Sequence, residues 1–288
     1  MLHRIRVWNI LFVIALSLIA GCGNSSSDPA PAVYKVEYLP GTGMNAPAQG
    51  KTTFQLKITK QSDGSPATGL NPSLTLTMHM TSGHTHATPV DSITESGTAG
   101  VYDCTVYYLM ASGPTMGTWE MNVTVDGETT TFHPDVAMAM GSDNVSATLY
   151  GADDIVTGMS GTSYNKYYIF RDGMASASMG TLNLYFSHSE NMTMDFTAVS
   201  EGSVLSAPTS TITSMIVSAS TDSTFASGVA TGIDHAHGHW SLSGLTNLVS
   251  AQTTTVYVKL NVNGQDKTTN GVAAAGTNAY ATFFVTPQ

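Results

Sequence analysis

The chain has 288 residues, with 10 basic and 20 acidic side chains and a formal net charge of −10. Nucleic acids are bound by clustered lysine and arginine, so this balance excludes them as expected partners and favours cations instead. Methionine and histidine are frequent, with 15 and nine residues respectively. This composition favours soft-metal chemistry, because thioether and imidazole together suit copper better than calcium or magnesium.

The N-terminus has the pattern of a bacterial lipoprotein signal. Arg4 and Arg6 form a basic start, residues 10–20 are apolar, and small residues lead to Cys22. The apolar run is too short for a helix that spans a membrane. We therefore expect a signal peptide over residues 1–21, cleaved before Cys22, whose thiol then carries the lipid. The alternative is an ordinary cleaved signal followed by a chance cysteine.

Residues 22–31 are rich in serine, proline and other small side chains, which is typical of a flexible tether. Such a protein is anchored to a membrane surface through its lipid and does not span the membrane. Gly23 resembles the position in outer-membrane lipoproteins, which lack aspartate directly after the lipidated cysteine. Cleavage also removes Arg4 and Arg6, which leaves 8 basic and 20 acidic residues and a formal charge of −12.

Apolar and polar residues alternate in several segments of the mature chain, and this period of two predicts β-strands. The clearest segments are residues 54–58, 74–80, 119–125 and 256–262. Clusters of turn-forming residues separate the runs, as in antiparallel sandwiches. Asp126-Gly127 and Asn263-Gly264 predict tight hairpin turns, because these pairs tolerate positive φ angles. The sequence therefore predicts an all-β protein.

A weak internal duplication divides the mature chain. Residues 121–128 and 260–265 share Asn, Val and turn positions, and each half is expected to open with a tyrosine-rich strand. We expect two tandem antiparallel immunoglobulin-like β-sandwiches, at residues 32–148 and 160–288, with a linker at residues 149–159. A single larger sandwich is the alternative.

The first cluster of candidate metal ligands comprises His79, Met80, His84, His86 and Met116. In a strand, His79 and Met80 face opposite sides, so they do not converge on one ion by themselves. A turn over residues 81–83 returns the two later histidines toward them, and a nearby loop supplies the second thioether. Three or four such ligands suit Cu(I), or Cu(II) through imidazoles alone. The alternative is that the methionines fill the core and the histidines are solvated.

The same region carries four short motifs, at residues 76–80, 83–86, 100–102 and 116–123. Together they resemble the YtkA-like and FixH-like periplasmic domains over residues 50–126. The resemblance implies a small immunoglobulin-like sandwich with a Met/His loop, and a link to copper handling or to the assembly of a copper-containing oxidase. This chain departs from the usual pattern in its lipid anchor, its second sandwich and the lack of a membrane helix after the signal.

The second cluster comprises His235, His237 and His239, which alternate along the sequence. An extended segment places all three imidazoles on one face, with neighbours about 6 to 7 Å apart. Asp234 then joins the site or orients one ring, and copper, zinc or nickel would accept such ligands. Trp240 falls on the opposite face and is expected in the core. The alternative is a polar strand face exposed to solvent.

Weaker candidates for additional metal ligands are His188, Met192, Met194 and His133. For these we favour the alternative, in which the methionines pack and the histidines lie in loops. Cys104 lies on the same strand face as Tyr102 and Val106, which favours a buried inert thiol over a thiolate ligand.

The sequence contains no nucleophile elbow, phosphate-binding loop, haem-attachment motif or metalloprotease helix, so we expect no enzyme. The function that we expect is a lipoprotein of the bacterial envelope that buffers, transfers or confers tolerance to a soft transition metal, copper first and zinc second. The alternative is a non-catalytic interaction or structural β-sandwich that presents its loops to another envelope protein. The two hypotheses differ in geometry, because a metal site requires the named side chains to meet.

Overall fold

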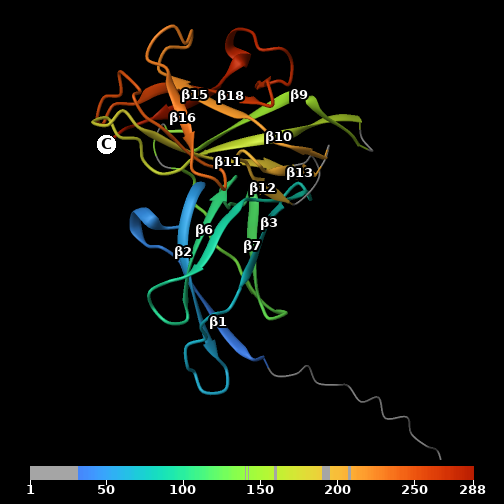
Figure 1. The fold of residues 1–288 in the computed structure, drawn as a ribbon. Coiled ribbons are helices and arrows are strands. Elements are labelled where there is room, and N and C mark those ends of the chain that lie inside the picture. The colour runs from blue at the N-terminus through green and yellow to red at the C-terminus, as the bar shows by residue number, and fades with distance from the viewer. Residues whose placement is uncertain (1–31, 140, 142, 159–160, 190–194, 207–208) are drawn as a thin grey trace, which may run out of the picture. The chain divides into compact units, whose positions relative to one another are not determined.

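The computed structural model describes residues 32–139, 141, 143–158, 161–189, 195–206 and 209–288 (Figure 1). Residues Val33–Gln288 form one compact unit. Across the described residues the structure is β-strand with two short 3-10 helices, η1 (Gly43–Asn45) and η2 (Gly276–Ala279), and no α-helix. No helix in this described part is long and apolar enough to cross a membrane. The all-β prediction is confirmed, while the predicted signal peptide, Cys22 and most of the tether lie outside the described residues.

The first half, residues 33–139, contains two four-stranded antiparallel sheets. One has the order β1-β2-β6-β5, with strands β1 (Tyr34–Leu39), β2 (Gly50–Lys60), β6 (Val101–Tyr108) and β5 (Val90–Glu95). The other has the order β4-β3-β7-β8, with strands β4 (Thr85–Ala87), β3 (Ser73–Met80), β7 (Gly117–Val125) and β8 (Glu128–Phe132). Figure 1 shows these strands in blue to green.

The alternation of the sequence explains how these two sheets pack. In β2 every second residue is buried, including Leu56 and Ile58, and β7 repeats the pattern with Trp119 and Met121. The buried residues of both sheets form one hydrophobic cluster, which also contains Met78. Each fully buried aliphatic side chain contributes about 1.5–3 kcal/mol, so this shared cluster holds the sheets together as an immunoglobulin-like sandwich.

The second half, residues 143–288, is built on a ten-stranded antiparallel sheet. Its order is β19-β18-β15-β16-β17-β11-β10-β9, and β12 pairs with β11 and β20 with β18. The strands are β9 (Ser146–Gly158), β10 (Gly161–Arg171), β11 (Leu182–Ser189), β12 (Phe196–Ala198), β15 (Met215–Ser220), β16 (Ala230–Asp234), β17 (His239–Leu242), β18 (Thr254–Val262), β19 (Gln265–Lys267) and β20 (Ala281–Val285). Strands β13 (Val204–Ser206) and β14 (Thr209–Thr211) form a separate pair.

The ends of this ten-stranded sheet meet. Tyr150 in β9 and Thr268, just after β19, exchange two backbone hydrogen bonds of 2.7 Å. The sheet thereby encloses a second hydrophobic cluster, which includes Trp240 as the sequence predicts.

The two predicted hairpins are confirmed. Asp126 and Gly127 join β7 to β8 with φ angles of 47° and 88°, and Asn263 and Gly264 join β18 to β19 with 52° and 82°. Two consecutive positive φ angles define the type I′ turn, whose twist matches that of the flanking strands. The two halves therefore share this hairpin.

The predicted linker at residues 149–159 is wrong for all its described residues. Residues 149–158 belong to β9, which pairs with β10. The first strand of the second half is therefore β9, which begins at Ser146, and not the tyrosine-rich segment, which lies in β10. Gly151, Asp153 and Asp154 have the composition of a turn. They lie in β9 between Tyr150 and Ile155, where the register with β10 shifts, and such irregularities in a strand accept these residues.

Candidate metal centre

The first histidine cluster lies on the hairpin formed by β3 and β4. Met78 stands opposite His86 in the ladder, and His79 stands opposite Thr85. Because directly opposite residues of an antiparallel pair share a face, Met78 and His86 face the core of the sandwich and His79 faces outward. The structure thus separates two histidines that the sequence groups together.

His79 belongs to the outer surface. Its side chain is 50% exposed, and its Nε2 lies 3.5 Å from a carboxylate oxygen of Glu120. His84, at the turn, is exposed, and its carbonyl accepts a hydrogen bond of 2.9 Å from the backbone N–H of Met80. His79 is therefore not part of the inner-facing group.

His86 is half-buried and makes two polar contacts. Its Nδ1 lies 3.0 Å from the carbonyl oxygen of Ala87, and its Nε2 lies 3.2 Å from Sδ of Met110. A carbonyl oxygen only accepts, so in the neutral ring Nδ1 carries the hydrogen. In that tautomer Nε2 presents its lone pair to the Met110 sulfur, whereas in the other tautomer or the protonated ring Nε2 donates an N–H to this sulfur, which is a weak acceptor. A soft cation bound by both atoms would make this contact attractive.

Trp119 positions both members of this pair. Its buried indole packs edge to face against His86, with ring centroids 5.4 Å apart and an interplanar angle of 84°. Its Nε1 donates a hydrogen bond of 2.9 Å to the carbonyl oxygen of Met110. Met78 stands between β4 and β7 in the ladder, opposite both His86 and Trp119. One row across three strands therefore holds an imidazole, a thioether and an indole.

Further thioethers lie at the same end of the sandwich. Met80 and Met116 both pack against the first hydrophobic cluster, and the carbonyl of Met116 accepts a hydrogen bond of 3.1 Å from the N–H of Thr81. His133 is exposed, with its Nδ1 3.3 Å from the backbone oxygen of Trp119. The imidazole of His86 and the thioether of Met110 are in direct side-chain contact.

The second histidine cluster is a turn. Ala236, His237 and Gly238 have φ angles of 65°, 50° and 83°, and the N–H of His235 donates to the carbonyl of His239 over 2.8 Å. The predicted extended segment with three histidines on one face is therefore wrong, because β16 and β17 form a hairpin at this point. His235 contacts Ser241 Oγ at 2.7 Å, and His237 is exposed.

His239 joins the two halves of the compact unit through an ion-pair network. Its Nδ1 lies 2.8 Å from Asp172 and its Nε2 lies 3.0 Å from Asp91 of β5. Asp172 also accepts hydrogen bonds from Lys51 Nζ at 2.5 Å and from the Tyr107 hydroxyl at 2.8 Å. Both nitrogens of the His239 ring face carboxylates, so this imidazole is held as a cation and not as a metal ligand.

The charges of this network shift the pKa values of its members. Hydrogen bonds to Asp172 and then to Asp91 raise the pKa of His239 from its ordinary value of 6.5 to about 9. Burial would raise the pKa of Asp172, but hydrogen bonds from His239, Lys51 and Tyr107 outweigh burial and hold that pKa well below 3.8. Tyr107 also stacks on Tyr185, with ring centroids 4.2 Å apart and an interplanar angle of 2°. These contacts hold the halves together.

One further weak candidate can be placed. His188 lies in β11, buried, with its ring 5.1 Å from that of Tyr167, and so it is a core residue and not a loop residue. Met192 and Met194 lie outside the described residues.

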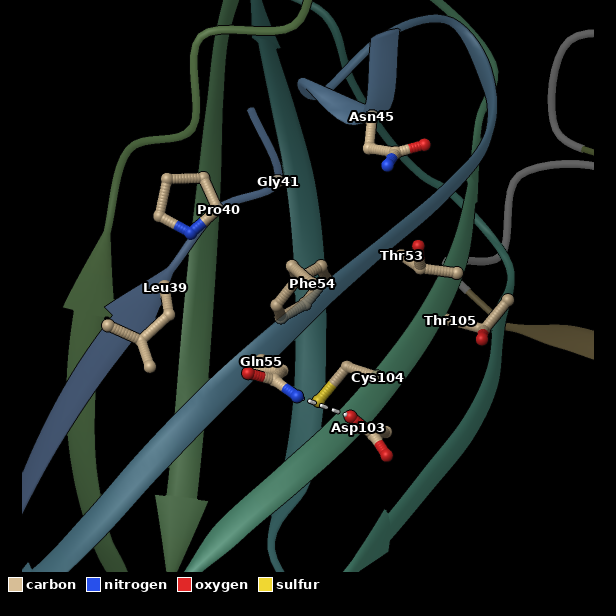
Figure 2. Close-up of a pocket in the computed structure, with 10 residues that line it drawn as sticks. All are labelled: Leu39, Pro40, Gly41, Asn45, Thr53, Phe54, Gln55, Asp103, Cys104 and Thr105. Carbon is tan, nitrogen blue, oxygen red and sulfur yellow. Dashed lines mark hydrogen bonds between the residues drawn. The ribbon is translucent and has the colours of Figure 1, made fainter. Parts of the chain in front are cut away.

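Cys104 is buried, as the sequence predicts, and burial raises the pKa of its thiol to about 12. It contributes to the wall of a shallow cavity of 410 Å³ on the outer side of β2 and β6 (Figure 2). The polar contact in that cavity is a hydrogen bond of 2.9 Å from Gln55 to Asp103. A protonated thiol is neither a nucleophile nor a metal ligand, so we assign no reaction to Cys104.

Met110, Asp91 and Asp172 are the residues that sequence reasoning missed. Met110 follows a strand with no histidine near it, and its contact with His86 spans 24 residues. Among the described residues, no group of three or more His, Cys, Asp or Glu side chains is arranged to hold a metal ion.

No protein-family model matches the chain. No curated protein matches it. Two solved structures that it resembles are described as an anomalous substructure of Titin-A168169 and as a chimeric titin Z1Z2-Z1Z2 tandem. They are 10% and 13% identical, cover 81% and 87% of this chain and 94% and 96% of their own, and have TM-scores of 0.21 and 0.20. Scores this low carry no argument about function, and the resemblance to YtkA-like and FixH-like domains stays a prediction.

Proposed function

We propose that this chain is a lipid-anchored protein of the bacterial envelope that binds copper through its first half. The observation that supports the proposal is the contact of 3.2 Å between His86 Nε2 and Met110 Sδ. Imidazole and thioether are the side chains that copper accepts most readily in combination. Binding needs no catalytic base, in line with the expectation of no enzyme.

The donor set fits a metal ion in two respects. A ligating imidazole usually donates its other N–H to a carbonyl or carboxylate, and His86 Nδ1 makes that contact with Ala87. Metal bonds of about 2.0 Å to nitrogen and 2.3 Å to sulfur set the two ligand atoms roughly 3.5 Å apart at a tetrahedral angle. The observed 3.2 Å is close to that separation.

The test is a competition titration of residues 23–288, which contain the compact unit Val33–Gln288, with Cu(I), Cu(II) and Zn(II) against a chelator. We expect stoichiometric copper binding that His86→Ala weakens. The matched control is His79→Ala, because His79 lies on the same hairpin but faces outward. Copper binding no tighter than that of a generic histidine-bearing surface would contradict the proposal and leave the alternative, an interaction module for another envelope protein.

The membrane anchor is a separate part of the proposal. Its basis is the signal-like N-terminus and Cys22, and the localisation proposed is the outer membrane because Gly23 follows Cys22. Replacing Cys22 by Ser should release the protein from membranes in a fractionation experiment. Unchanged membrane association of Cys22→Ser would show that the lipid anchor is wrong, whatever the result for copper.

A further inference from the structure

We infer that the centre at His86 and Met110 selects Cu(I) over Cu(II) and Zn(II), an inference that rests on the proposed function. The selection follows from three properties of the centre. They are the number and softness of its ligands, its burial, and the indole that fixes both ligand residues.

The ligands suit a monovalent soft ion. Zn(II) and Cu(II) are commonly held by three or four nitrogen, oxygen or thiolate ligands, whereas thioethers favour Cu(I). The one imidazole in the inner-facing row is His86, and the other possible donors are the thioethers of Met110 and Met78. In the described part of the chain, no cluster of three His, Cys, Asp or Glu side chains completes a harder site.

Burial acts in the same direction. Met78 and Trp119 are fully buried, and His86 and Met110 are half-buried. The penalty for moving an ion out of water grows with the square of its charge, so a divalent ion loses more than a monovalent one at a site walled by apolar groups. A carboxylate ligand would offset this desolvation penalty for a divalent ion. The polar contacts of His86, however, are a carbonyl oxygen and a thioether.

Trp119 is the positioning residue of this centre. The same indole packs on the His86 ring and holds the Met110 backbone through its N–H. The His86 ring in β4 and the Met110 backbone in the segment after β6 are thereby held in place before any ion arrives. Pre-organisation lowers the ordering cost of binding and favours an ion that accepts the existing geometry.

The experiment compares the mature chain with Met110→Leu, which removes the thioether at nearly constant volume. The control is Met179→Leu, because Met179 is 68% exposed and lies in the second half. Cu(I) under anaerobic conditions, Ag(I) as a monovalent soft ion without redox chemistry, Cu(II) and Zn(II) are titrated against chelators. X-ray absorption of the Cu(I) form reports sulfur ligands, and tryptophan emission reports binding next to Trp119.

We expect Cu(I) and Ag(I) to bind much more tightly than Cu(II) or Zn(II). Met110→Leu should weaken both monovalent ions roughly tenfold to a hundredfold, as the loss of a supporting group at a metal site does, and should reduce the sulfur signal. Met179→Leu should change neither. This inference would be overturned if Met110→Leu bound Cu(I) with an affinity within about twofold of that of the unmodified chain, because a twofold change corresponds to a negligible binding free energy.

Two other outcomes separate this inference from the proposed function. Cu(II) binding that depends on His86 and exceeds Cu(I) binding overturns the selectivity and leaves the copper function standing. Absence of tight copper binding in either oxidation state overturns both.

Discussion

His86 in the first half and His239 in the second are both half-buried imidazoles beside an aromatic ring, yet the ring nitrogens of the two residues contact different kinds of groups. His86 faces a carbonyl oxygen with one nitrogen and the Met110 sulfur with the other. His239 faces carboxylates with both. A ring that donates from one nitrogen keeps a lone pair for a metal, whereas a ring that donates from both is a cation. The partner of the second nitrogen, and not the local density of histidines, therefore separates the proposed metal ligand His86 from the ion-pair residue His239.

The largest effect that we predict is a loss of protein stability when the ion-pair network around His239 is broken. Asp172→Asn removes the charge that Lys51 and His239 share, and breaking such a partly buried pair should lower the free energy of unfolding by about 3 kcal/mol. Chemical denaturation of residues 23–288 measures this change. The matched control is Glu37→Gln, which removes a carboxylate from an exposed ion pair with Lys35 and should change nothing measurable. Equal stability of Asp172→Asn and the unmodified chain would show that the network does not hold the halves together.

A smaller effect concerns pH. The pKa of His239 is raised from 6.5 to about 9, so the stabilisation from its protonated ring is fully present below pH 6.5 and is lost as the pH rises through 9. The ring is 29% exposed, so we expect about 2 kcal/mol, less than the full pKa shift would give. The measurement is the stability difference between the unmodified chain and His239→Gln from pH 6 to pH 10. A difference that is constant over this range would mean that His239 is not charged in the folded protein.

The smallest effect tests what the halves have in common. Gly127→Ala and Gly264→Ala place an alanine at φ angles of 88° and 82°, where a Cβ meets no neighbour within 4 Å. The loss is then purely one of backbone conformation, about 1 kcal/mol in each hairpin. Thermal unfolding measures it, with Gly97→Ala as a control, because a Cβ there also meets open space but φ is not positive. Unequal losses at the two turns would weaken the evidence for a duplicated hairpin.

The fold was largely predictable, because its signals are local. Strand alternation around Leu56 and Leu76, the two turns and the burial of Cys104 and Trp240 each depend on residues next to one another in the sequence. The linker prediction failed because Gly151 and the Asp153-Asp154 pair are typical of turns but here lie at a register shift within β9. Sequence pattern alone does not distinguish these cases.

The candidate site was predictable only in part. The alternation along β3 correctly places His79 and Met80 on opposite faces of the strand, but the partner of His86 comes from 24 residues away. The partners of His239 are more distant still, at 67 and 148 residues. Such contacts are set by how the sheets pack, and a pattern of neighbouring histidines contains no information about them.

The most direct test of this account is a Cu(I) competition titration of two variants side by side, His86→Ala and His239→Ala. We predict that His86→Ala binds Cu(I) at least about tenfold more weakly than the unmodified chain, a change of about 1.4 kcal/mol. His239→Ala, although less stable, should bind Cu(I) as the unmodified chain does when measured well below its unfolding temperature. Equal losses in the two variants, or a loss in His239→Ala alone, would contradict the assignment of the metal ligand to the first half and of the ion pair to the second.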